Sequence, residues 1–139
     1  MPFENPAFKA NGTIRRCRFV KQDTSADNLV LEADANEAIV GISDESAQDA
    51  PIPNASANAA EAGDMLRIYT IGKVCLLEVG TGGWTPGAEL KSDADGKGVL
   101  VATTGTTIQE IGAIALKTGV AGDLSPVIVF RGVRRPDAA

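Results

Sequence analysis

The chain has 139 residues, of which 44% are hydrophobic and 4% are aromatic, and its net charge is -5. This length suits one domain, or one domain with arms, whose core consists mainly of aliphatic side chains. Histidine is absent, which removes the commonest general base and the commonest nitrogen ligand of zinc. No apolar run approaches the roughly 20 residues that span a bilayer, and the first residues lack a signal-peptide pattern. We therefore expect a non-enzymatic protein that is made in a cytoplasm-like compartment and binds no membrane.

The charges are distributed unevenly along the chain. Residues 1–21 hold five Lys or Arg against one acid, whereas residues 22–64 hold ten acids and no Lys or Arg. The C-terminal tail adds Arg131, Arg134 and Arg135. This layout predicts either electrostatic docking of the basic ends onto a partner or another subunit, or an ordinary solvated surface.

Residues 1–12 are predicted to form an extended arm, because Pro2 and Pro6 disfavour helix. Phe3 and Phe8 are two of the four phenylalanines in the chain. They either fold back onto their own domain or anchor the arm on a neighbouring molecule.

Three short strands are predicted next, over Thr13–Val20, Asn28–Ala33 and Ala38–Ile42. Residues 44–62 then change in composition and are rich in Ala, Ser, Asn and Asp. This composition predicts a long surface loop.

One phrase occurs twice in the rest of the chain. Ala62-Gly63-Asp64 precedes Met65–Ile71, and Ala121-Gly122-Asp123 precedes the apolar run Leu124–Phe130. A Gly-Asp turn that leads into such a run predicts entry into a strand.

Further strands are predicted over Lys73–Val79, Ala88–Lys91, Val99–Ala102, Ile108–Leu116 and Val127–Phe130. Gly72-Lys73 is expected to join Met65–Ile71 to Lys73–Val79 as a tight hairpin. The pattern gives about 8–10 short strands and no long helix. We therefore predict an all-β fold, a small antiparallel β-barrel or sandwich with an extended N-terminal arm. The predicted organisation is an arm at 1–12, a single β domain at 13–132 and a tail at 133–139.

Few segments carry chemistry. Asp93-Ala94-Asp95-Gly96 resembles the start of a calcium loop but lacks the later glutamate, so a hairpin turn is the better interpretation. The glycine-rich segments match neither a P-loop nor a dinucleotide fingerprint. The acidic balance and the few aromatic residues argue against nucleic-acid binding. We expect no metal and no cofactor.

Cys17, Cys75 and Trp84 each leave two interpretations open. The cysteines lie in apolar alternating runs, which favours buried free thiols over a disulfide or a reactive thiol. Trp84 stands in a Gly/Pro loop, where it is either a plug that closes one end of a barrel or a possible interface anchor.

A series of segments resembles the small head-decoration, or cement, proteins of tailed phages. The segments are Ala38–Ile42, the acidic loop, Gly63-Asp64, Arg67–Val74, Thr85–Leu90, Asp95-Gly96-Lys97, Ile111–Leu116, Gly122-Asp123 and Val127–Phe130. The resemblance covers roughly residues 36–132. Lipoyl-like domains share this pattern, but they carry a modified lysine at the hairpin tip where this chain has Asp93-Ala94-Asp95.

The resemblance implies a structural protein on the outside of an expanded phage head. Members of that family typically form trimers, bridge coat subunits against internal DNA pressure and contact the major capsid protein through terminal arms. The resemblance thus implies a homotrimer that binds the major capsid protein on the virion exterior.

The residues that we expect to contact the coat protein are taken from the chain itself. They are Phe3, Asn5, Pro6 and Phe8 in the arm, Arg15, Arg16 and Arg18 at its base, and Arg134 and Arg135 in the tail. An arm strand would supply backbone hydrogen bonds. Each buried phenylalanine would contribute about 1.5–3 kcal/mol.

Two other functions remain open from the sequence. The first is another virion component, such as the base of a head fibre or a minor coat component. The second is a small carbohydrate- or ligand-binding β-barrel in which Trp84 and the Thr103–Thr107 loop line a site.

Overall fold

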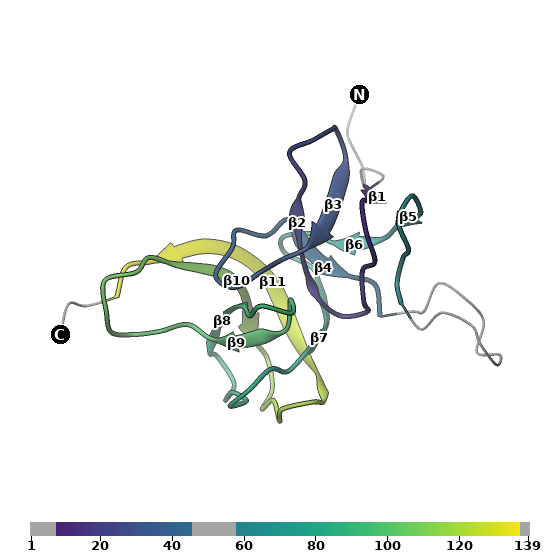
Figure 1. Cartoon of the computed structure of the whole chain (residues 1–139). Coiled ribbons are helices and arrows are strands. Elements are labelled where there is room, and N and C mark those ends of the chain that lie inside the picture. The colour runs from purple at the N-terminus through teal and green to yellow at the C-terminus, as the bar shows by residue number, and fades with distance from the viewer. Residues whose placement is uncertain (1–7, 46–57, 137–139) are drawn as a thin grey trace.

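The computed structural model describes residues 8–45 and 58–136, and this part of the chain is all-β with eleven strands (Figure 1). The prediction of an all-β fold is confirmed. The strands are β1 (Phe8–Ala10), β2 (Phe19–Gln22), β3 (Leu29–Glu32), β4 (Gly41–Ser43), β5 (Met65–Leu66), β6 (Ile68–Tyr69), β7 (Val74–Glu78), β8 (Glu89–Ser92), β9 (Gly98–Leu100), β10 (Gln109–Ala115) and β11 (Leu124–Arg134).

The first half of the chain forms a six-stranded sheet with the order β5-β1-β3-β2-β4-β6. The strands β5 and β6 are separated only by Arg67, yet they lie at opposite ends of this order. The sheet therefore nearly closes on itself as a small barrel. Its pairs are antiparallel except for β1 with β3, which run parallel. The buried residues inside it are Phe8, Ala10, Ile14, Val20, Val30, Ala60 and Ile68.

The second half forms a five-stranded antiparallel sheet with the order β7-β11-β10-β8-β9. A bridge between Val79 and Gly98 brings the end of β7 to the start of β9, so this sheet also nearly closes. Its buried side chains include Leu77, Leu90 and Val127, which pack in one cluster with Trp84.

The two sheets share this second core. Phe19, Ile39 and Ile42 come from the first half of the chain but belong to the cluster of the five-stranded sheet. A Cβ at Gly112 in β10 would lie 2.6 Å from the ring of Phe19. Glycine at this position therefore lets β10 and β2 come close together.

The repeated Gly-Asp phrase forms the same turn twice, as predicted. Gly63 and Gly122 both have a φ of +91°, a conformation that glycine adopts at little cost. The amide of Asp64 donates to the carbonyl of Glu61 and that of Asp123 donates to the carbonyl of Val120, both at 3.0 Å. The two turns lead directly into β5 and β11.

The predicted hairpin at Gly72-Lys73 is wrong. The segment 65–71 breaks into β5 and β6 around Arg67, and β6 pairs with β4 rather than with β7. A turn at Thr70–Lys73, in which the Lys73 amide donates to the Thr70 carbonyl at 3.1 Å, instead carries the chain from one sheet to the other. A turn signal fixes a local reversal but not the partner of each strand.

Two predicted boundaries also differ from the structure. Residues 8–10, which were assigned to the arm, form β1 and pair with β3 and β5. β11 continues to Arg134, so residues 133 and 134 belong to the sheet rather than to the tail. The residues at 1–7, 46–57 and 137–139 lie outside the described part of the chain.

Candidate functional site

One face of the five-stranded sheet is apolar and open to solvent. Along β11 the buried residues alternate with exposed or half-buried ones that point outward, as the two faces of a strand require. Neighbouring strands continue this outer face, because Ile128 pairs with Val74 on one side and Ile114 on the other. We call this surface the apolar stripe; it consists of Val74, Leu76, Ile114, Leu116, Leu124, Pro126, Ile128 and Phe130.

Half of the stripe is strongly exposed. The exposed fractions are 58% for Val74, 46% for Leu124, 44% for Leu116 and 43% for Phe130. Exposed apolar side chains that adjoin one another, rather than being scattered singly, are typical of a protein-binding surface.

This surface is not among the predicted sites, because in sequence Leu124–Phe130 indicates only an apolar run that enters a strand. The available signal was that the outward positions of β11 are as apolar as the inward ones, a pattern typical of a strand that is covered on both faces.

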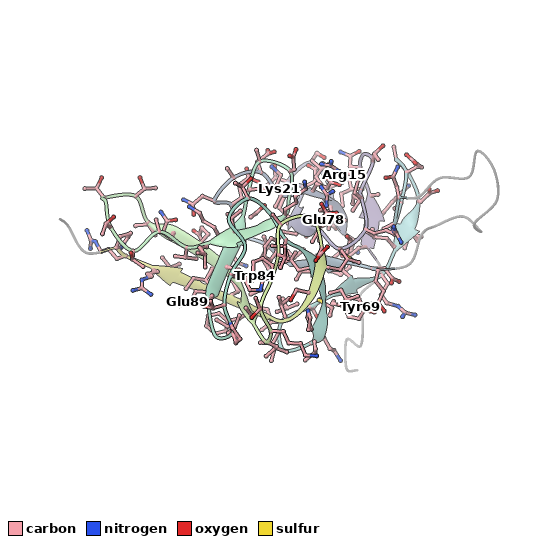
Figure 2. The ribbon with its side chains drawn as sticks, turned by 90° about the horizontal axis from the view of Figure 1, so that it is seen from below. Arg15, Lys21, Tyr69, Glu78, Trp84 and Glu89 are labelled. Carbon is pink, nitrogen blue, oxygen red and sulfur yellow. The ribbon has the colours of Figure 1, made fainter. Side chains whose placement is uncertain are left out.

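Two acids in register with the stripe are paired within the chain. At one end, Glu89 is opposite Ile114 and binds Arg134 at 2.6 Å. At the other, Glu78 is opposite Leu124 and binds Arg18 at 3.2 Å and Lys97 at 3.3 Å. Glu78 and Glu89 are well separated in Figure 2.

Arg18 was predicted to contact the coat protein, but the structure places it inside the chain. It is 7% exposed, and it donates to the carbonyl oxygen of Asp95 at 2.9 Å in addition to binding Glu78. The guanidinium thus joins the start of β2 to β7 and to the β8–β9 turn. Arg18 therefore has a structural role in the folded chain, and this burial counts against the predicted surface contact.

Arg15 and Arg16 differ in their partners within the chain. Arg15 binds Glu32 in a bidentate manner, with its Nη2 at 2.8 Å from Oε1 and its Nε at 3.1 Å from Oε2, and this contact raises the pKa of Arg15. Arg16 is exposed and donates to the carbonyl oxygen of Glu45 at 3.4 Å. Both line a groove of about 210 Å³ that Leu124 also borders. Arg16 is therefore the most available of the three predicted arginines.

The other predicted contact residues do not converge on one site. Phe8 is 9% exposed and packs inside the six-stranded sheet, so it folds onto its own domain, whereas Phe3, Asn5 and Pro6 lie outside the described residues. The end of β11, which carries Arg134, lies at the opposite end of the molecule from β1 (Figure 1). The next residue, Arg135, is exposed.

Trp84 is a core residue rather than an interface anchor. Its indole is 4% exposed and donates to the carbonyl of Lys117 at 3.0 Å, and it lies inside the five-stranded sheet (Figure 2). This burial favours the plug interpretation. It also removes Trp84 from the lining of a ligand site, although the predicted partner loop Thr103–Thr107 is exposed.

Asp93-Ala94-Asp95-Gly96 forms the predicted turn, between β8 and β9. The Asp93 carboxylate accepts hydrogen bonds from the backbone amides of Asp95 at 2.8 Å and Lys97 at 2.9 Å. Within residues 8–45 and 58–136, no three His, Cys, Asp or Glu side chains are grouped to hold a metal ion. Over the same ranges, no helix is long and apolar enough to cross a membrane.

Cys17 and Cys75 are both free and buried. Burial raises the pKa of Cys17 from 9.0 to about 11 and that of Cys75 from 9.0 to about 12, because a buried thiolate is poorly solvated. The thiolate is the reactive form of cysteine. The arrangement thus favours the structural interpretation of both cysteines.

We expect both thiols of the folded protein to resist iodoacetamide at neutral pH and to react once urea unfolds the chain. Below pH 9.0 the thiols are protonated in both the folded and the unfolded chain, so their burial does not lower the free energy of unfolding. As the pH rises towards about 11, the unfolded chain ionises first and stability falls. Mass spectrometry of the alkylated chain checks the first expectation, and urea midpoints against pH check the second. Rapid alkylation of the folded protein, or an equal pH dependence in a Cys17→Ala/Cys75→Ala variant, would contradict this account.

No protein-family model matches the chain, and no curated protein matches its sequence. Among solved structures, the fold is similar to the crystal structure of the head fiber gp8.5 N base in bacteriophage phi29, with a TM-score of 0.59. The alignment covers 89% of this chain and 91% of that chain at 13% sequence identity. At this identity the likeness shows a shared fold over nearly the whole of both chains.

Proposed function

We propose that this chain is a structural protein of a phage head that binds the outer surface of the expanded shell as a cement protein. In this role it bridges subunits of the major capsid protein and stabilises the shell against internal DNA pressure. It acts as a homotrimer and without catalysis.

The observation that supports this proposal best is the fold shared with a phage head-fiber base over nearly the whole of both chains. A second support is the kind of surface present. The chain offers an apolar sheet face and an arginine-lined groove, both of which suit contact with other proteins. The sequence resemblance to cement proteins, which bind the outside of the phage head, also supports the proposal.

The base of a head fibre is the second candidate, and the same structural likeness favours it. The two roles differ in their effect on the shell. A cement protein raises the temperature at which expanded heads rupture, whereas a fibre base binds the heads and leaves that temperature unchanged. Thermal rupture of heads with and without the bound protein therefore distinguishes the two.

The purified protein is expected to co-sediment with expanded phage heads that lack it, saturably and at a fixed ratio to coat protein. Arg16→Glu should weaken this binding several-fold at low salt, because Arg16 is exposed and forms no ion pair with the described residues. High salt should reduce the difference between this variant and the wild-type protein.

Arg135→Glu is the matched control, since Arg135 is also exposed but lies beyond the end of β11. Weaker binding of the Arg135 variant alone would place the contact at the tail rather than at the groove. Failure of the wild-type protein to bind at any salt concentration would contradict attachment to the head.

A further inference from the structure

The apolar stripe needs a partner that can cover a sheet face. Its residues lie on the three neighbouring strands β7, β11 and β10, except Leu116, which directly follows β10, and the pairing of Ile128 with Val74 and Ile114 keeps them in one layer. Sheet faces of this kind pack against other sheet faces, with their side chains interdigitated. By contrast, Met65 is the one large apolar residue in the described strands of the six-stranded sheet that is mostly exposed.

The charges around the stripe suit a partner with the same charge as this chain. Identical copies each carry a net charge of -5 and repel one another, so a contact surface without unpaired acids keeps that repulsion smallest. The stripe itself contains no charged residue. The acids in register with its ends, Glu78 and Glu89, are neutralised by Arg18, Lys97 and Arg134 of the same chain. Two copies can therefore meet here without burying these acids unpaired, which would be costly.

A partner selected by charge would require a different surface. A hetero-partner that recognises charge would face a group that forms no ion pair with the described residues, such as Arg16 in the neighbouring groove. The stripe can bind a partner only through apolar contact and a complementary shape. The groove therefore suits a partner that carries charge, and the stripe, which adjoins the groove at Leu124, suits an uncharged surface such as the stripe of another copy.

We propose that the apolar stripe is the surface through which copies of this chain pack against one another. This inference deepens the proposed function and relies on it only for the number of copies, three. In a trimer the three stripes face one another around a threefold axis, with β11 of each copy nearest the axis and β7 and β10 on either side.

The test is the mass of the protein in solution, measured by light scattering after size exclusion and without any phage heads. The wild-type chain is expected at three times the monomer mass of 14.3 kDa. The variant Val74→Glu/Leu116→Glu, which puts a charge at both sides of the stripe, is expected at the monomer mass. Fluorescence of the buried Trp84 should remain that of the wild-type protein, which shows that the variant is folded.

Met65→Glu is the matched control, because Met65 is 60% exposed and Val74 is 58% exposed, but on different sheets. This variant should keep the oligomer. Any oligomer that the stripe variant dissociates and the control keeps supports the interface, even if it has another number of copies. A monomeric wild-type chain, an oligomer that survives in the stripe variant, or equal dissociation by the control overturns it.

The result is independent of head binding. Monomers that bind heads saturably would leave the proposed function in place and remove this inference. Oligomers that dissociate as expected but never bind heads would do the reverse.

Discussion

Replacement of Trp84 by alanine is expected to destabilise the fold by about 3–5 kcal/mol, the usual cost of truncating a large buried aromatic residue. The indole is 4% exposed, and its environment cannot collapse into the space that it leaves. A Cβ at Gly119 would lie 2.5 Å from Cε2 of the indole, and one at Gly98 would lie 2.9 Å from Cζ3. The neighbouring backbone is thus already pressed against the ring and has no side chains to move inward. Urea unfolding followed by far-ultraviolet circular dichroism measures the effect.

Trp84→Phe is the control that separates volume from hydrogen bonding. It keeps most of the ring volume but loses the donor that binds the Lys117 carbonyl at 3.0 Å. The loss of that hydrogen bond alone should cost about 0.5–1.5 kcal/mol, so this variant should lie between the wild-type protein and Trp84→Ala. If Trp84→Ala were as stable as the wild-type protein and instead lost binding to heads, the anchor interpretation would be restored.

The sequence predicted those parts of the fold that depend on local chemistry. The Gly-Asp turns at residues 63 and 122 formed as expected, because a positive φ at a glycine is a local requirement. The Asp93–Gly96 turn formed for the same reason, with its own carboxylate closing it. The segments 28–33 and 73–79 contain β3 and β7.

Strand partners could not be predicted in this way. The split of 65–71 into β5 and β6 arises because the two strands pair with β1 and β4, which come from elsewhere in the chain. The parallel pairing of β1 with β3 likewise joins strands that are not consecutive along the chain. Such contacts between distant parts of the chain are set by the packing of the whole molecule. Hydrophobic periodicity in the sequence predicts strands but not their partners.

The candidate site was predicted only in part for a related reason. A cluster of arginines in sequence indicates positive charge, but its availability depends on acids that the fold brings near. Glu32 and Glu78 are far from residues 15–18 in sequence and neutralise two of the three arginines. Only Arg16 keeps the exposed position that the prediction assumed.

The second large effect is expected for Arg18→Ala, which should destabilise the fold by about 3 kcal/mol, near the lower end for a broken buried ion pair. The Arg18 side chain is 8% exposed and that of Glu78 is 22% exposed, so water replaces the lost partner poorly. Lys97, at 3.3 Å from Glu78, remains and limits the loss. The midpoint of urea unfolding measures the change.

Arg16→Ala is the neighbouring control, because Arg16 is exposed, and its stability should stay within about 0.5 kcal/mol of the wild-type protein. The double variant Arg18→Met/Glu78→Leu should recover much of the loss. Replacing a buried pair by apolar side chains is often neutral, and the buried Nε of Arg18 has no hydrogen-bond partner among the residues that the structure describes.

Together these variants separate the two roles that a cluster of arginines can have. If Arg18 holds the two sheets together, its loss lowers stability, and the paired apolar replacement restores stability without restoring any charge. If Arg18 instead contacted the coat protein, Arg18→Ala would keep its urea midpoint and bind heads weakly, and the apolar pair would bind no better. Arg16→Ala should show the opposite behaviour to Arg18→Ala, with normal stability and weaker head binding. The urea midpoint and the head-binding curve of one variant series therefore assign a role to each arginine.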